Sequence, residues 1–117
     1  MSDERFPKAV RLRKRAEFKH VERRGKRRSG PSLIVYAASN SLDHSRVGLT
    51  VSRKVGNAAR RNRWKRRLRE LFRRNTDRFP AGWDYVVIVK KSAPEERPFD
   101  VLRDELLTLL NEASGRK

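Results

Sequence analysis

The alternation of apolar and polar residues predicts three strands. Residues 33–38 (LIVYAA) are β-forming, and residues 84–90 (DYVVIVK) are the most apolar run, which is typical of a central strand. In residues 46–54 (RVGLTVSRK), one face is made of Val47, Leu49 and Val51 and the other of Gly48, Thr50, Ser52 and Lys54. We expect the first face in the core, whereas the second presents small polar groups that end in a cation.

Apolar residues spaced by three and four positions predict a helix near each end of the chain. Residues 16–24 suit a short helix with Phe18 and Val21 on one side. Residues 99–113 suit a longer helix that covers one face of the sheet with Leu102, Leu106, Leu109 and Leu110. Both helices are therefore expected to pack on the strands through an apolar stripe.

The remaining segments are expected to be irregular. Residues 1–14 have no sustained periodicity and are expected to form a mobile basic arm, in which Leu12 is the side chain most suited to burial. Residues 26–31 are expected to form a basic loop and residues 39–45 a polar turn, and residues 114–117 are expected to fray.

A third helix, over residues 58–74, has two different faces. It follows Gly56, which supplies a turn, and Asn57, which is a natural N-cap. At 100° per residue, an apolar stripe within an arc of about 100° is formed by Trp64, Leu68, Leu71 and Phe72. The opposite side carries Asn62, Arg66, Arg69 and Arg73. We expect the first side in the core and the second as a ridge of cations in solvent.

The order helix, two strands, helix, strand, helix predicts a single α+β domain over residues 1–117. Only 36% of the residues are hydrophobic and 38% are charged, so the core is expected to be thin. A membrane span needs about 20 apolar residues, and no apolar run in the chain approaches that length. No hydrophobic segment of a signal peptide follows Met1. A cytoplasmic protein is the simplest expectation.

The charge favours a polyanionic partner. The chain has 31 basic and 14 acidic residues, which gives a net charge of +17. Between positions 53 and 74, Glu70 is the only acid among eleven basic residues. A solvated charged helix would alternate signs for pairing across one turn, so this helix indicates nucleic-acid binding. A DNA-reading helix-turn-helix is disfavoured because a strand, not a helix, leads into it.

The chain shows no catalytic constellation of its own. It has no cysteine, and its two histidines, His20 and His44, have no second ligand at a metal-binding spacing. The carboxylates, which a metal-dependent nuclease would need to converge, are scattered over Asp43, Asp77, Asp84, Glu95, Glu96 and Asp100. Serines lack a paired histidine motif. The sequence therefore predicts no catalytic residue and no metal site.

Residues 51–72 (VSRKVGNAARRNRWKRRLRELF) resemble the signature of the bacterial ribonuclease P protein component family. In that family a strand ending S-[KR]-K-hydrophobic-G-N-A runs into a helix that opens R-N-R-x-K-R. RLRKRAEFKHV, RVGLTVSRKVGNA and DYVVIVK extend the resemblance over most of the chain. It implies a single-layer, mostly antiparallel sheet of about four strands with three helices. It also implies a further short strand near residues 51–55 and a left-handed βαβ crossover through the basic helix.

The resemblance also implies two sites. The RNA-binding site, facing ribonuclease P RNA, would consist of Arg53, Lys54, Asn57, Arg60, Arg61, Asn62, Arg63, Lys65, Arg66, Arg69 and Arg73. A cleft on the open sheet face would hold the single-stranded 5′ leader of precursor tRNA with Phe18, Tyr36, Thr50, Ser52 and Lys54. Aromatic rings beside small polar groups suit stacking of unpaired bases. The alternative for both aromatic residues is a plain core role. Family members often carry a second aromatic where this chain has Glu22.

The resemblance implies the protein subunit of an endoribonuclease that removes 5′ leaders from precursor tRNA. Mg²⁺ would be held mainly by the RNA subunit, with one monomeric protein per RNA and no catalytic group from the protein. Two alternatives remain open from the residues: a small basic ribosomal protein, and a free-standing ribonuclease, which the scattered carboxylates disfavour.

Overall fold

The computed structural model describes residues 11–91, residue 93 and residues 97–115. The expected mobile arm over residues 1–14 and the expected frayed tail over residues 114–117 lie only in part within these residues. In the described parts, the Leu12 N–H donates to the carbonyl of Val47 at 2.9 Å, and the Ser114 N–H donates to the carbonyl of Leu110 at 3.1 Å. The helices are α1 (Arg15–Arg24), α2 (Ala58–Arg74) and α3 (Phe99–Ala113), with the 3-10 turns η3 (Arg53–Val55) and η4 (Thr76–Arg78). Its strands are β1 (Lys26–Ser29), β2 (Leu33–Ser39), β3 (Arg46–Thr50) and β4 (Trp83–Val89). The predicted α+β class is confirmed.

The four strands form one mixed sheet in the order β1-β2-β4-β3. β1 pairs with β2 and β2 with β4 in antiparallel fashion, whereas β3 and β4 are parallel and are joined through α2. The apolar strand β4 is central, as predicted. Parallel neighbours need a crossover connection, and here the basic helix provides it.

Two strand predictions were wrong. The expected basic loop after α1 is instead edge strand β1, whose four residues (KRRS) are all exposed and pair with β2. A short edge strand tolerates charge on both faces, so it leaves no apolar alternation to find. Strand β3 ends at Thr50 instead of continuing to Lys54, and the family-implied strand at residues 51–55 is replaced by η3. There the chain turns away from the sheet toward α2.

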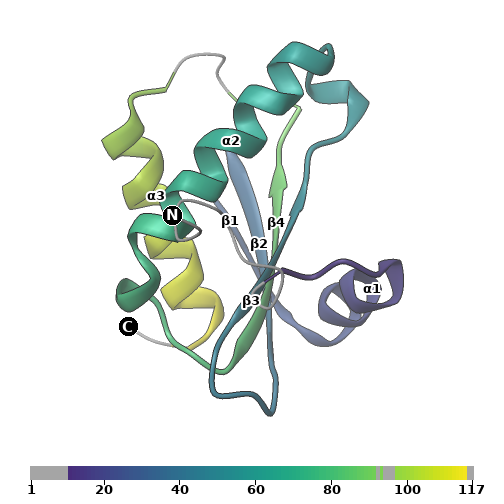
Figure 1. Ribbon diagram of the computed structural model, residues 1–117, viewed down its shortest axis with the longest axis vertical. Coiled ribbons are helices and arrows are strands. Elements are labelled where there is room, and N and C mark those ends of the chain that lie inside the picture. The colour runs from purple at the N-terminus through teal and green to yellow at the C-terminus, as the bar shows by residue number, and fades with distance from the viewer. Residues whose placement is uncertain (1–10, 92, 94–96, 116–117) are drawn as a thin grey trace, which may run out of the picture.

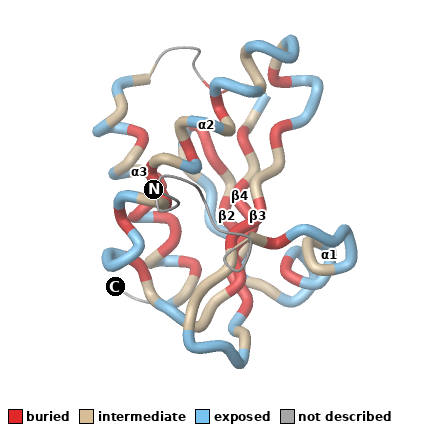
Figure 2. Tube along the Cα trace, in the orientation of Figure 1, coloured by how far each residue is buried: buried red, intermediate tan, exposed pale blue. Residues whose placement is uncertain are grey.

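The sheet has one fully covered face and one partly covered face. Helices α2 and α3 lie on the first, and α1 lies on the second (Figures 1 and 2). The large core between the sheet and α2 and α3 includes the whole predicted stripe, Trp64, Leu68, Leu71 and Phe72, and the predicted leucines Leu102, Leu106, Leu109 and Leu110. The smaller core under α1 contains Leu12, Val21, Ala38 and Val86. Burial of Leu12 was predicted.

Helix α3 also holds the β1–β2 turn. Oε2 of Glu105 accepts hydrogen bonds from the backbone N–H groups of Ser32 (2.8 Å) and Leu33 (2.9 Å). The Glu105 side chain is 7% exposed, and a Cβ at Gly30 would lie 2.7 Å from its Oε2. Both the carboxylate and the missing side chain at Gly30 are therefore needed for this close approach. Among the described residues, no helix is long and apolar enough to span a bilayer.

Candidate nucleic-acid interface

The start of α2 is fixed by the predicted cap. Oδ1 of Asn57 accepts a hydrogen bond from the Arg60 N–H at 2.9 Å, which satisfies one of the free donors of the first turn. Gly56 before it has φ of 157°, and a Cβ there would lie 2.7 Å from Cδ of Arg60. The Gly-Asn pair therefore sets the direction in which α2 leaves the sheet.

The outer side of α2 carries the predicted ridge of Asn62, Arg66, Arg69 and Arg73, which we call the basic ridge. Asn62, Arg66 and Arg69 are exposed. Within the described residues, the guanidinium groups of Arg66 and Arg69 have no hydrogen-bond or ion-pair partner. Arg73 is half-buried and donates to Glu70 through Nη2 at 2.6 Å. The central part of the ridge is thus available to an external anion.

Other cations of α2 face the protein. Nη2 of Arg60 donates to the carbonyl of Ala93 at 3.1 Å, and Nε of Arg61 donates to the carbonyl of Gly56 at 3.2 Å. Arg67, which was not in the predicted site, donates to the carbonyl of Arg97. These arginines tie α2 to the turn before it and to the segment before α3. An arginine has five N–H donors, so these bonds leave others for a ligand.

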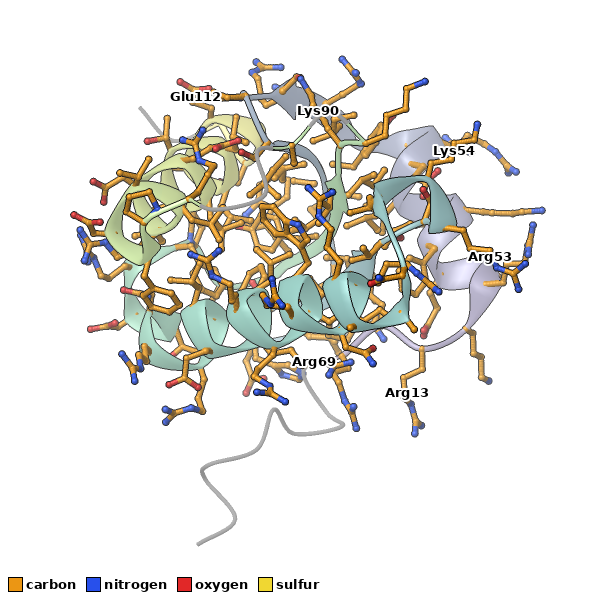
Figure 3. All side chains as sticks on the ribbon, turned by 90° about the horizontal axis from the view of Figure 1, so that it is seen from above. Arg13, Arg53, Lys54, Arg69, Lys90 and Glu112 are labelled. Carbon is orange, nitrogen blue, oxygen red and sulfur yellow. The ribbon has the colours of Figure 1, made fainter. Side chains whose placement is uncertain are left out.

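Exposed cations continue the surface past the start of α2. Arg53 and Lys54 lie on η3, where Oγ of Ser52 accepts from the Lys54 N–H at 3.2 Å. Figure 3 shows Arg53 and Lys54 projecting outward at the end of the molecule that carries α1. Arg63 is exposed and Lys65 is half-buried on α2. The cationic surface therefore extends from α2 toward the partly covered face of the sheet.

On that face, paired residues of neighbouring strands line up in rows. Tyr36 lies opposite Val86, which lies beside Gly48. The next row, beyond α1, joins Ile34, Ile88 and Thr50, all half-buried. Cross-strand partners share a face, so the second row extends the Tyr36 surface with apolar and hydroxyl groups. Ile88 was missing from the predicted site, although its parity in β4 indicates this face.

Phe18 reaches this face from α1. A Cβ at Gly48 would lie 2.4 Å from Cε2 of Phe18, so the ring rests where a larger residue would project. Phe18 and Tyr36 are both half-buried and pack against the smaller core. Each ring therefore packs on the core with one part and leaves another part exposed. The two roles that the sequence offered as alternatives, core packing and leader binding, are compatible in this geometry. Glu22, one helical turn beyond Phe18, is exposed.

A charged network that the sequence did not reveal holds α1 on the sheet. Nε and Nη2 of Arg46 donate to Oδ1 and Oδ2 of Asp84 at 2.9 and 2.7 Å, and Nη1 donates to Oε2 of Glu17 at 3.3 Å. Oε1 of Glu17 accepts from the N–H groups of Arg13 and Lys14 at 3.0 Å each. The helix that carries Phe18 is therefore tied to both β3 and β4.

These contacts change the acidity of two groups in the network. Backbone hydrogen bonds, chiefly from Lys14 and then Arg13, lower the pKa of Glu17. The hydrogen bond to Asp84 raises the pKa of Arg46. Both shifts favour the charged forms, so the network is stable as an ion pair at neutral pH. No local pattern signals it, because Arg46 and Asp84 are 38 residues apart in the sequence.

No metal-binding cluster is found in the described part of the chain, where groups of three or more His, Asp and Glu side chains are absent. His44 instead contacts the carboxylate of Asp43, with Nδ1 2.9 Å from Oδ1. His20 is exposed on α1. Apart from the network around Arg46, the charged residues that this site brings together are cations, on α2 and η3, next to the partly covered sheet face.

Comparison with known proteins places this arrangement in a family. The family model described as Ribonuclease P matches residues 6–114. The ribonuclease P protein component of Thermotoga maritima is 42% identical over 115 residues, which cover 96% of this chain and 98% of that protein. The corresponding protein of Syntrophus aciditrophicus is 41% identical over 97 residues, covering 83% of this chain and 82% of that protein.

Solved structures agree with the sequence relatives. The RNase P protein from Thermotoga maritima superposes with a TM-score of 0.80 at 40% identity, covering 87% of this chain and 96% of that one. The RNase P protein of Staphylococcus aureus gives a TM-score of 0.81 at 31% identity, covering 94% and 100%. Family match, sequence identity and fold lead to one assignment. The chain belongs to the ribonuclease P protein component family.

Proposed function

We propose that this chain is the protein subunit of a ribonuclease P ribonucleoprotein that removes the 5′ leader from precursor tRNA. The observation that carries the proposal is the division of α2, which buries one complete apolar stripe and turns the basic ridge outward. Arg66 and Arg69 have no partner among the described residues, so their charges are uncompensated. An RNA backbone supplies phosphates at a spacing that a helical ridge can follow.

The ridge would bind the RNA subunit mainly through phosphates. Guanidinium groups present planar donor pairs that match two phosphate oxygens, and each contact releases counterions from the RNA. Arg53 and Lys54 extend this contact beyond the start of α2. One monomeric protein per RNA is part of this proposal.

The partly covered sheet face would hold the leader. Exposed parts of Phe18 and Tyr36 offer surfaces on which unpaired bases stack, and Thr50, Ser52 and Lys54 offer hydrogen bonds and charge. The turn η3 leads from β3 of this face into α2, which carries the ridge, so one RNA complex could engage both. The Arg46 network fixes α1 and with it the position of Phe18.

The phosphodiester would be cleaved by water with the help of Mg²⁺ ions held mainly by the RNA subunit. When bound, such ions activate the attacking water and stabilise the leaving oxygen. The protein's cations would neutralise RNA phosphates and favour the folded RNA, and its sheet face would add affinity for the leader. In this division of work the protein binds and positions, without contributing a group to the chemical step.

Reconstitution tests the assignment. Purified protein is added to precursor tRNA at low Mg²⁺, with and without ribonuclease P RNA, and cleavage of the leader is followed. Cleavage that needs both components supports the proposal. Cleavage by the protein alone would identify a free-standing ribonuclease, and no effect of the protein in either reaction would favour a ribosomal RNA-binding protein.

The leader site is tested with paired substrates. Tyr36→Ala is expected to weaken binding of precursor tRNA to the assembled enzyme by about 1–3 kcal/mol, the value of one stacked base, and to leave mature tRNA unchanged. Glu22→Phe is expected to tighten precursor binding selectively, because it adds a ring and removes a negative charge. Equal losses for both substrates with Tyr36→Ala would make Tyr36 a core residue only.

A further inference from the structure

A second group of basic side chains lies away from α2, at the place where α1 ends and β1 begins. His20 and Arg24 of α1 and Lys26 of β1 line a pocket of about 330 Å³ together with Trp83 and residues 37–39 of β2. This volume is within the range of roughly 300–1,000 Å³ that holds small ligands. We call it the Trp83 pocket. Figure 1 shows α1 and α2 on opposite sides of the sheet, so this pocket is separate from the basic ridge.

The close packing of Gly25 brings two of these cations to the pocket. A Cβ at this position would lie 2.5 Å from the carbonyl oxygen of Val21 and 2.7 Å from that of Ala37. The end of α1 can therefore lie directly on the backbone of β2 only because residue 25 has no side chain. Arg24 is the last residue of α1, and Lys26 is the first of β1 and pairs with Ala37. The contact at Gly25 thus sets both cations beside the last residues of β2.

Trp83 forms the aromatic part of the pocket. It begins β4 and lies opposite Ser39, the last residue of β2. Its backbone N–H donates to Oγ of Ser45 at 3.1 Å, which holds the start of the strand in place. Trp83 packs against the large core but is only half-buried. An indole in this position keeps a fixed orientation through its packed part and offers its remaining surface to a ligand.

The charges beside this ring are not balanced by the protein. No carboxylate is among the described residues that line the pocket. Arg24 and Lys26 are exposed, and within the described part of the chain their side chains have no hydrogen-bond or ion-pair partner. Cations at the end of a helix offset its dipole, but that role needs no aromatic ring beside them. Two uncompensated cations next to a half-exposed indole suit a ligand that is both anionic and aromatic.

We propose that the Trp83 pocket binds one nucleotide of single-stranded RNA, with the base stacked on Trp83 and the phosphate held by Arg24 and Lys26. Every base has a flat π-face, so stacking on an indole tolerates any sequence. Guanidinium and ammonium groups supply charge-assisted hydrogen bonds to the phosphate. The bases of a duplex are stacked on one another and are not free for this contact, so the strand must be unpaired.

Two kinds of strand can supply the nucleotide, the leader of precursor tRNA or a single strand of another RNA. Phe18 on the proposed leader face and Arg24 in the pocket are about 9 Å apart along the axis of α1, at about 1.5 Å per residue. A leader that passes Phe18 can therefore continue into the pocket. The assignment to the leader rests on the proposed function, whereas binding of a nucleotide does not.

Tryptophan fluorescence of the full chain tests the pocket, with a short single-stranded oligoadenylate as the probe. Trp64 is 2% exposed in the large core, so a change on titration reports on Trp83, the only other tryptophan. We expect saturable quenching as a base stacks on the indole. In the double variant Arg24→Gln, Lys26→Gln the apparent Kd is expected to rise roughly tenfold or more, because two charged hydrogen bonds are lost.

The matched control is the double variant Lys19→Gln, Arg23→Gln, which removes two exposed charges from α1. Arg23, like Arg24, lies in the last turn of α1, so both double variants lose the same net charge and a cation near the helix end. The control is expected to change the Kd on the order of twofold. Circular dichroism reports whether each variant folds. Trp83→Phe, which keeps an aromatic ring on the core, is expected to abolish the quenching.

Equal weakening in the two double variants, or quenching that does not saturate, would overturn the pocket. Two competitors of the oligoadenylate test the chemistry: an abasic ribose-phosphate oligomer lacks the base, and polyglutamate supplies charge alone. Each is expected to bind roughly tenfold or more weakly, because stacking is lost. Displacement by polyglutamate at the concentration at which unlabelled oligoadenylate displaces the probe would identify a surface for acidic peptides and overturn the nucleotide assignment.

These readouts need no ribonuclease P activity. Saturable quenching in a chain that fails to activate cleavage would refute the proposed function alone, and activation without quenching would refute the pocket alone. The source of the strand is decided in the assembled enzyme with precursor tRNAs whose leaders increase in length. If the leader occupies the pocket, a longer leader tightens binding to the natural chain but not to the Arg24→Gln, Lys26→Gln variant. If leader length acts equally on both, the nucleotide comes from another RNA strand.

Discussion

Helices α2 and α3 lie on the same face of the sheet and have similar lengths, 17 and 15 residues, but their outer sides carry opposite charge. The outer side of α2 presents exposed Asn62, Arg63, Arg66 and Arg69. That of α3 presents exposed Asp100, Val101, Asp104, Thr108 and Glu112. Figure 3 places Glu112 far from Arg53 and Lys54, so the contrast extends across the molecule.

The inner sides of the two helices do the same work. Each contributes four or more fully buried apolar residues to one core, and burial of each such side chain stabilises the fold by about 1.5–3 kcal/mol. Core packing therefore explains the apolar side of each helix, but it does not explain why the outer sides of the two helices differ in charge. A charge excess on α2 alone costs stability by self-repulsion, so its location reflects a partner rather than folding.

The largest expected effect comes from substitutions in the core that α2 and α3 share. Leu68→Ala in α2 and Leu106→Ala in α3 each leave a cavity in the same core and are expected to cost about 2–5 kcal/mol of unfolding free energy. Urea denaturation measures both, with exposed Val101→Ala as the control. A loss below 1 kcal/mol at either leucine would show that the core on that helix is loosely packed.

The second prediction concerns the one acid of α3 that serves the fold. Glu105→Ala leaves the N–H groups of Ser32 and Leu33 without their acceptor and is expected to cost about 1–3 kcal/mol for each unsatisfied group. Its neighbour Asp104 is exposed, so Asp104→Ala is expected to change stability by no more than about 0.5 kcal/mol. Similar urea midpoints for the two variants would argue against the Glu105 contact.

The third prediction separates the outer sides. Arg66→Ala is expected to weaken binding to ribonuclease P RNA and to reduce the slope of log K against log salt by about 0.7–0.9, the value of one phosphate contact. Arg103→Ala makes the same charge change on α3, where Arg103 pairs with Asp104, and is expected to leave the slope unchanged. Thermal stability of Arg66→Ala is expected to hold. An equal slope change in both variants would mean that net charge, not the ridge, drives binding.

The smallest expected effect comes from Glu70, the only acid of α2. Hydrogen bonds from Arg73, and then from Arg74, lower its pKa in the folded protein. Its contribution to stability is therefore fully present above the unfolded pKa of about 4.3 and is lost as pH falls through the lower folded pKa. In Glu70→Gln, the drop in urea midpoint between pH 7 and pH 3 is expected to be smaller than in the natural chain. An unchanged drop would show that this pair contributes nothing measurable.

Elements with strong periodicity could be predicted from the sequence to the residue. Both α2 and α3 begin and end as predicted, because a continuous apolar stripe and, for α2, the Asn57 cap define them. Strand β1 was missed because its stability comes from pairing with β2, while its own side chains are all polar. Local sequence carries no record of such a partner.

The candidate site also contains features that the sequence predicts and features that it does not. Helical periodicity places Arg66 and Arg69 outward, and the structure agrees. It also fixes the direction of Arg60, but it cannot show that the carbonyl of Ala93 lies across from it. The Arg46–Asp84 pair joins positions distant in sequence, so it becomes visible only in three dimensions. RNA and leader contacts themselves stay predictions until the variants are measured.

The strand order has a consequence for how the chain folds. Among the described strands, β4 comes last in the sequence, but it lies between β2 and β3 in the sheet. Strands β2 and β3 do not pair with each other. Until residues 83–89 are available, only the β1–β2 hairpin can form, and an isolated hairpin is marginally stable in water. Strand β3 can join the sheet, and the apolar stripe of α2 can be buried, only after β4 has paired with β2. This long-range pairing is slow because a long loop has to close. The domain is therefore expected to fold in one late cooperative step, and a fragment that ends before Trp83 is expected to remain unfolded.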